Sequence, residues 1–258
     1  MARLTYSVNL GDDEVLPVWQ TVIELADVID TSTLTIVGGL MVQLHAARGG
    51  VIAARSTDDA DVLLDALVDP GSLIAFSAAV ARLGFELKDD ERYAYRFIHQ
   101  DGRKIDAMIP DHLPRHVRIR LARKPGLAVS AGQQALDRRQ LYRLTFTSGA
   151  SVLVGVPDEL GALIAKGAAY LDDQRDRGRH LDDASTILAS ITDASELDYS
   201  RSTRSDRARL RAIRSELGDE SAAHWVNLRT DDRTRGLMNL SLVTAAMGVD
   251  EPSPPPVL

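Results

Sequence analysis

Glycines and aspartates occur in this chain at spacings that suit the binding of phosphate and metal ions. Gly38 and Gly39 end an apolar run, and paired glycines allow a tight turn whose backbone N–H groups can approach a phosphate. Asp59 and Asp61 follow about twenty residues later, and on a strand this spacing of two places both carboxylates on one face. Carboxylate oxygens are ligands of Mg²⁺. The pattern indicates a site for a nucleoside triphosphate with its metal ions.

A third carboxylate, that of Asp106, falls on a segment expected to pair with its neighbour. Asp-Gly within 100–102 separates the alternating runs 93–99 and 103–109, which predicts a β-hairpin. Apolar residues flank Asp106, so a bound cation would be an obvious partner for its charge. Together the aspartates would form a two-metal phosphoryl-transfer site, with Asp106 as the base or as a ligand of the second ion.

Each of these signals also has a structural interpretation. Acidic residues at alternate strand positions commonly face solvent. Paired glycines more commonly form a plain turn than a phosphate-binding loop. The order and spacing of Gly38, Gly39, Asp59, Asp61 and Asp106, taken together, favour the binding site.

The elements that would position these residues follow from the local sequence. A β-branched run at 33–37, the two glycines and the helix formers at 40–47 predict a strand, a turn and a helix. Residues 53–64 predict the strand that carries Asp59 and Asp61. The other expected elements are helices at 15–29 (behind acidic residues 12–14), 73–84, 160–171, 181–191, 204–217 and 231–247, a strand at 85–87 and a strand pair within 141–156.

This succession of elements predicts an α+β fold with a mixed sheet core. Pro157 follows the last expected strand and opens a helical half. The expected division is a core at 1–156 and a C-terminal helical lobe at 157–250. The proline-rich residues 251–258 are expected to be a disordered tail, because they cannot pack or pair in a sheet.

Composition limits the classes of protein that the chain could be. With 258 residues, 45% of them hydrophobic, the chain can bury a substantial core. The absence of cysteine excludes disulfides, thiolate nucleophiles and cysteine metal sites, and agrees with a reducing cytoplasm. Neither a signal peptide nor a membrane span is recognised, so a cytoplasmic protein with no membrane partner is expected.

Charge argues against one kind of partner and leaves room for another. A net charge of -7 disfavours general coating of nucleic acid. Two basic stretches nevertheless offer a local surface for phosphates, one at 115–124 and one formed by the arginines of 201–214. Arg204, Arg207, Arg211 and Arg214 are spaced to share a helix face. Such a face could track a phosphate backbone, or could be a solvated surface with local salt bridges.

Five segments, in this order, resemble the AbiEii-like (AbiEii/AbiGii, MenT-like) nucleotidyltransferases of the polymerase-beta-type superfamily. They are VGGLMVQLH at 37–45, RSTDDAD at 55–61, GRKIDAMIP at 102–110, Val-Pro at 156–157 with KGAAY at 166–170, and RHLDDASTIL at 179–188. The resemblance covers roughly residues 30–190. It implies a nucleotidyltransferase core followed by a helical lobe, transfer of a nucleotide from a triphosphate to tRNA, and a possible antitoxin partner.

The resemblance also implies roles for particular residues. Gly38 and Gly39 would bind phosphate, Asp59 and Asp61 would bind magnesium or manganese, and Lys166 would face the triphosphate. Arg55 and Thr57 would brace the acidic loop, and Asp183, rather than Asp182, would be the late aspartate of the site. Lys166 on an alanine-rich helix could otherwise face solvent, and Asp183 could otherwise stabilise a helix dipole.

Some residues depart from the family pattern. Asp58 adds a third acid to the loop, so a cation or Arg55 would be needed as counter-charge. Gly39 replaces a serine of the wider superfamily, so backbone N–H groups would have to bind the phosphate there. His180 replaces a basic residue, which weakens the expected triphosphate contact. His45 is expected to be packed or on a helix surface rather than to be a ligand.

The function expected from these observations is magnesium-dependent transfer of a nucleoside monophosphate from a triphosphate to an acceptor hydroxyl. Through the resemblance, the expected acceptor is tRNA and the expected effect is that of a growth-inhibiting toxin. The same chemistry on a small molecule or a protein hydroxyl is a second interpretation. A noncatalytic protein that binds a nucleotide or a partner is a third.

Overall fold

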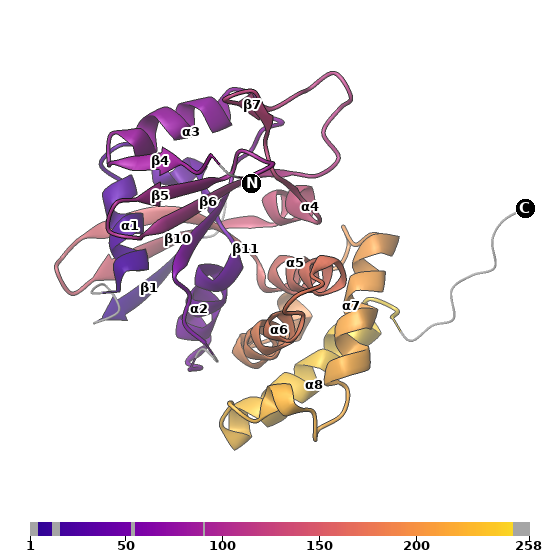
Figure 1. Ribbon diagram of the computed structural model, residues 1–258. Helices are drawn as coiled ribbons and strands as arrows, with labels where there is room; N and C mark the ends of the chain where they lie inside the picture. Colours follow the sequence, from indigo (N-terminus) through magenta and orange to yellow (C-terminus); the bar gives the residue numbers. More distant parts are fainter. Residues whose placement is uncertain (1–4, 12–15, 53–54, 90, 250–258) are drawn as a thin grey trace, which may run out of the picture.

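The chain folds into a sheet with helices on its faces, followed by a group of helices (Figure 1). The computed structural model describes residues 5–11, 16–52, 55–89 and 91–249. Within them the main sheet has the order β1-β10-β11-β2-β3-β6-β5-β4, and β9 pairs with β6. Its strands are β1 (Thr5–Gly11), β2 (Thr35–Ile36), β3 (Asp59–Leu63), β4 (Phe85–Leu87), β5 (Arg96–His99), β6 (Lys104–Pro110), β9 (Ala128–Val129), β10 (Arg139–Phe146) and β11 (Ser151–Pro157).

Helices lie between several of these strands along the chain, and further helices follow the last strand. The sheet part contains α1 (Pro17–Leu25), α2 (Gly38–Gly49), α3 (Ser72–Ala81) and α4 (Gly132–Asp137). The helices that follow β11 are α5 (Glu159–Asp172), α6 (Gly178–Ser190), α7 (Arg204–Leu217) and α8 (Thr230–Ala246). A short hairpin of β7 (Arg120–Leu121) and β8 (Lys124–Pro125) lies outside the main sheet.

The sheet is mixed, as the sequence predicted. β3 runs parallel to β6, β1 parallel to β10 and β11 parallel to β2, whereas the other neighbours in the main strand order are antiparallel. The predicted fold class, a mixed sheet core with a C-terminal helical lobe, is confirmed by this arrangement. The division at residues 156 and 157 into two domains stays a prediction.

Two differences from the predicted elements have simple physical causes. The strand predicted at 33–37 is reduced to β2, because Thr31–Thr33 forms a 3-10 turn instead. The Asp30 side chain accepts a hydrogen bond from Ser32 N at 3.0 Å and so stabilises that turn. β1 was not predicted; it pairs only with β10, far along the chain, and local sequence does not show such a partner.

The helical half begins and ends close to the predicted residues. Asp158 caps α5 by accepting a hydrogen bond from Gly161 N at 2.7 Å. α7 begins with a capping box between Thr203 and Asp206. The predicted arginine face of α7 is shorter than expected: Arg204, Arg207 and Arg211 are exposed, but Arg214 is partly buried and donates to Thr244 of α8.

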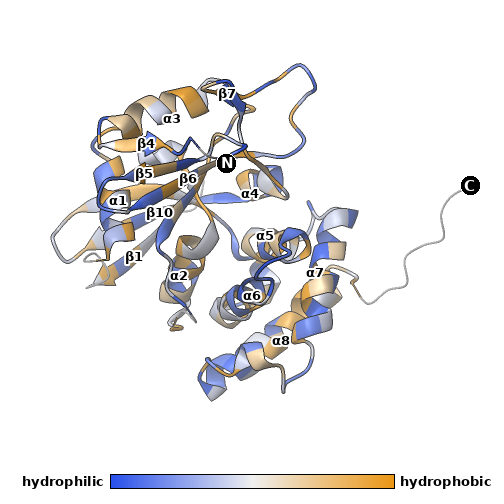
Figure 2. Ribbon diagram, viewed as in Figure 1, coloured by the Kyte–Doolittle hydropathy of each residue, from blue (hydrophilic) through white to orange (hydrophobic). Residues whose placement is uncertain are grey.

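A large apolar core runs from the sheet into the helices. Trp19 of α1 and Tyr142 of β10 are fully buried on the sheet side, and Trp225 is fully buried among the helices. α2 packs against α6, and a Cβ on Gly49 would come within 2.5 Å of Ser190 O, so glycine permits this close approach. Figure 2 shows hydrophobic residues along α3, which lies on the side of the sheet part away from the C-terminal helices. The sheet part and the C-terminal helices therefore share this core.

Some expectations concern residues that the structure does not describe or elements that it does not contain. The acidic residues 12–14, the start of the segment 53–64 and the tail 251–258 lie outside the described residues. Among the residues that are described, no helix combines the length and the hydropathy needed to cross a bilayer.

Candidate active site

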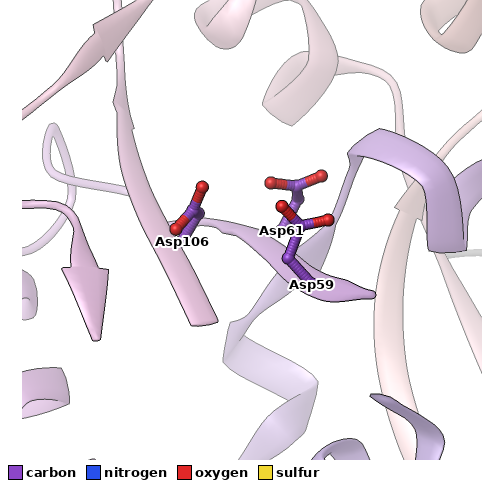
Figure 3. A group of neighbouring side chains, drawn as sticks. All are labelled: Asp59, Asp61 and Asp106. Atoms are coloured by element: carbon purple, nitrogen blue, oxygen red, sulfur yellow. The ribbon is translucent and has the colours of Figure 1, made fainter. Parts of the chain in front are cut away.

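Strand pairing brings the three predicted aspartates together. β3 and β6 are parallel neighbours, and Asp61 lies directly opposite Asp106 in their register. Asp59 is two residues before Asp61 and so shares its face of the sheet. Figure 3 shows the three carboxylates around a common space, and one oxygen from each lies within 4.8 Å of the others. These donors suit a divalent cation that prefers oxygen ligands.

The two glycines form the first turn of α2, directly beside the aspartates. Gly38 has a φ of +63°, and a Cβ there would overlap the Asp61 carboxylate. A Cβ on Gly39 would lie 2.6 Å from the Cβ of Thr57, the residue whose hydroxyl donates to Asp59 Oδ1 at 2.9 Å. The close packing of α2 on the acidic strand therefore requires glycine. It also places the N-terminal end of a helix, which favours anions, next to the carboxylates.

The carboxylates repel one another, and this repulsion is visible in their ionisation. Burial, together with the charges of Asp59 and Asp106, raises the pKa of Asp61 to about 7. Burial also raises the pKa of Asp106, although a hydrogen-bonded arginine opposes the shift. A divalent cation at this position would relieve the repulsion, so the donor set fits such an ion.

An arginine that sequence reasoning missed lies among the aspartates. Arg96 of β5 is opposite Asp106 in the antiparallel register. Its Nε donates to Asp106 Oδ1 at 2.8 Å and its NH2 to Asp106 Oδ2 at 2.5 Å. The same NH2 is 3.8 Å from Asp59 Oδ2. Asp106 was predicted to have a bound cation as its partner, but in the structure it is already paired with Arg96. The hairpin turn at 100–102 contained the signal, because it sets which residue pairs with Asp106.

Replacing Arg96 by glutamine should strengthen the binding of divalent ions. The guanidinium competes for the same carboxylate oxygens, so we expect Mn²⁺ to bind about tenfold more tightly to the Arg96→Gln protein. Isothermal titration without nucleotide measures this affinity directly. Arg92→Gln, at an exposed position near the same strand, is the matched control. Unchanged or weaker binding would mean that Arg96 holds Asp106 in place for the ion instead of competing with it.

Beside the aspartates lies a charged cluster formed by two residues of the helical half and by Arg55, which precedes β3. Lys166 of α5 donates to Asp183 Oδ2 of α6 at 2.6 Å, and Arg55 Nε lies 3.1 Å from Asp183 Oδ1. Lys166 is 5% exposed and Asp183 is 1% exposed. Burial alone would raise the pKa of Asp183, but Lys166 and Arg55 outweigh it and the pKa is lowered. Asp182 turns elsewhere, to His224 Nδ1 at 2.7 Å.

Two cavities meet at Asp61, which lines both of them. The first, about 350 Å³, is polar and is lined by Arg55 and Asp59 of the acidic segment and by Asp106 of β6. The second, about 700 Å³, lies between sheet and helices, with apolar walls from α2, the sheet and α4 and a charged rim from 172–180. Both cavities are lined by Gly38, Asp61 and Lys166. Asp61 therefore lies between a polar cavity, which also contains Asp59 and Asp106, and a larger, partly apolar one.

The histidines differ in their position. His180 lines both cavities, and its Nε2 is 3.1 Å from Asp173 Oδ2. Burial and the charge of Lys166 lower the pKa of His180, which disfavours its charged form. Arg179, the adjacent residue, supplies a positive charge at the same rim. His45 is buried and bonded to Pro157 O at 3.0 Å, which makes it a packed residue as expected.

Taken together, the fold and the site define a mixed-sheet protein with a three-carboxylate cleft covered by a helical lobe. No family model and no curated protein sequence matches the chain. Among solved structures, it is similar to the crystal structure of a "putative nucleotidyltransferase from H. pylori" with 13% identity and a TM-score of 0.40. The similarity covers 89% of this chain and 92% of that one. At this distance it carries no argument, so the proposal below depends on the geometry of the site.

Proposed function

We propose that the protein is a nucleotidyltransferase that moves a nucleoside monophosphate from a triphosphate to an acceptor hydroxyl. The observation that carries the proposal is the meeting of three carboxylates, the glycine N-terminus of α2 and buried Lys166 at the junction of two cavities. Such a site combines oxygen ligands for a metal with groups that bind phosphate. The carboxylates alone would support metal binding, but not a choice of substrate.

The larger cavity suits the donor nucleotide. Val37, Leu63 and Met108 give it an apolar wall against which a base and ribose could pack. The triphosphate would then extend toward Gly38, Gly39 and Lys166. Asp59 and Asp61 would hold magnesium or manganese, with Asp106 beside them, and the ion would neutralise the phosphate charge and polarise the reacting phosphorus.

The smaller cavity suits the reacting phosphates and the acceptor hydroxyl, because Gly39 and Lys166 line it together with Asp59 and Asp106. The acceptor oxygen forms a bond to the α-phosphorus while the bond from this phosphorus to the pyrophosphate oxygen breaks. Asp106, whose pKa is raised by burial, takes the hydroxyl proton on an oxygen that Arg96 gives up. Lys166 faces the charge that develops on pyrophosphate, and Asp183 with Arg55 holds Lys166 in place. Thr57 orients Asp59 through its hydroxyl.

For the acceptor we propose tRNA or another RNA, and for the biological effect growth inhibition in the cytoplasm with an antitoxin as partner. These finer assignments follow the resemblance to AbiEii-like transferases. Arginines exposed on α7 and on the segment 115–123 support an RNA acceptor, because they offer positive charge to phosphates. We also propose the division into a core at 1–156 and a lobe at 157–250.

Incubation with magnesium, each labelled triphosphate in turn and total tRNA tests the proposal. We expect label on RNA from at least one triphosphate, resolved on a denaturing gel, and no label with Asp59→Ala. Label on the protein itself or on an added aminoglycoside instead of RNA would favour the second kind of acceptor. Label retained by Asp59→Ala would exclude this site, and no transfer with any acceptor would leave a noncatalytic nucleotide-binding protein.

A further inference from the structure

A third cavity, separate from the aspartates, lies between α4 and the beginning of α7. It has a volume of about 300 Å³ and is lined by residues of 111–112, 131–138 and 201–209. α4 forms the wall between this cavity and the larger chamber of the active site, since Gly132 and Ala135 face the chamber and Gln133 and Gln134 face the cavity. Its size is that of a small ligand site.

Three residues that line the cavity carry buried polar atoms without hydrogen-bond partners. In the described part of the chain, both amide atoms of Gln134, Oε1 of Gln133 and NH2 of Arg138 are buried and unpartnered. The Arg138 side chain is only 2% exposed, and its NH1 donates a hydrogen bond to Asp198 O at 2.7 Å. Buried polar groups without partners are costly, so a ligand toward which these side chains could turn, and which supplied partners, would gain affinity.

The charges of the cavity favour a neutral ligand over a phosphate. Three arginines, Arg138, Arg201 and Arg209, face three aspartates, Asp111, Asp137 and Asp206. The carboxylates already accept hydrogen bonds; Asp111, for example, accepts from Ala131 N at 2.9 Å and Gln133 N at 3.1 Å. The unpartnered atoms include both donors and acceptors, whereas a phosphate dianion only accepts. The edge of a nucleobase offers both.

We propose that this cavity binds one unpaired nucleotide, with the base edge against Gln133, Gln134 and Arg138. The two basic segments adjoin it: Asp111 and His112 lie just before the first, at 115–124, and Arg201 begins the second. The loop between β6 and β7 projects from the sheet part above α4 (Figure 1), and its Arg115 and Arg118 are exposed. A chain of nucleotides entering the cavity would find positive charge on both sides.

The nucleotide could be free or part of an RNA strand, and the chemistry of recognition is the same. The exposed arginines favour the strand, because a single nucleotide would not reach them. In that case the cavity would hold a nucleotide of the acceptor one helix away from the active site, an assignment that rests on the proposed function. Binding itself does not require catalysis, so it is tested without divalent ions.

Fluorescence anisotropy in EDTA with four single-stranded RNA octamers, each rich in one base, measures the preference. We expect the wild-type protein to bind one octamer about tenfold more tightly than the others. Gln134→Leu should remove this preference while keeping its melting temperature, and Gln20→Leu, at an exposed position on α1, should retain it. Equal binding of all four octamers, or a preference that survives Gln134→Leu, would overturn the proposal.

Two further arms locate and define the ligand. Asp59→Ala should keep the base preference, because Asp59 lines the smaller cavity of the active site and not this one; loss of the preference would place the nucleotide in the active site and overturn the proposal. Displacement of the octamer by the free monophosphate at equal nucleotide concentration would assign the cavity to free nucleotides. Retention of the octamer would assign it to RNA. A transferase that shows no base preference would disprove only this inference.

Discussion

Replacing Asp61 by asparagine should abolish nucleotidyl transfer and, in the metal-free protein, increase stability. Asparagine keeps the shape of the side chain but removes one of three clustered charges, and a metal held by only the two remaining carboxylates, Asp59 and Asp106, would bind weakly. We expect transfer to fall by at least about a thousandfold. Since the pKa of Asp61 is raised to about 7 in the fold, its ionised form destabilises the native state, and we expect a gain of about 1–3 kcal/mol at pH 8.

The gain in stability should depend on pH in a defined direction. At pH values below the unfolded pKa of aspartate, Asp61 is protonated in both states and the two proteins should be equally stable. As the pH rises toward 7, the unfolded chain releases its proton first, so the wild-type protein loses stability relative to Asp61→Asn. Above about pH 7 the difference should stay constant.

Urea unfolding in EDTA at a series of pH values, beside the transfer assay, measures both effects. Asp27→Asn, at an exposed position near the end of α1, is the control and should change neither activity nor the pH dependence. A loss of activity with an equal loss of stability would show that Asp61 acts in the fold. Saturating Mg²⁺ should stabilise the wild-type protein more than the variant, since only the complete cluster binds the ion well.

The sequence predicted the position of the acidic cluster because local patterns determine most of it. Asp59 and Asp61 share a face through the two-residue period of a strand, and the Asp-Gly turn places Asp106 on a hairpin strand. The parallel register that sets Asp61 opposite Asp106 is not local, and only the order of motifs pointed to it. The hairpin pairing could also have revealed Arg96, but its competition for Asp106 depends on side-chain geometry.

Other features depend on packing between distant segments and could not be predicted from the sequence. Pairing of β1 with β10 joins residues more than a hundred positions apart, and neither segment indicates its partner. The cavity between α4 and α7 combines three segments, of which α4 was not predicted. Asp183 was distinguished from Asp182 by resemblance alone; in the structure the difference arises because adjacent helix positions face different neighbours.

Lys166 offers the second large effect, and its interpretation requires a paired variant. Lys166→Met should lower kcat by about a hundredfold to a thousandfold, because the charge that develops on the leaving pyrophosphate loses a buried cation. The substitution also leaves Asp183, which is 1% exposed, with Arg55 as its remaining partner. Breaking one partner of a buried pair commonly costs about 3–5 kcal/mol, and we expect a smaller loss here because Arg55 remains.

The double variant Lys166→Met with Asp183→Asn separates the two effects. Removing both charges leaves only Arg55 without its carboxylate partner, and because the Arg55 side chain is 35% exposed, stability should recover relative to Lys166→Met. Its transfer rate should remain as low as that of the single variant, because the cation that faces pyrophosphate is still missing. Urea unfolding and steady-state kinetics on the three proteins measure this. If the double variant regained activity together with stability, Lys166 would be a structural partner of Asp183 and the leaving-group role would be wrong.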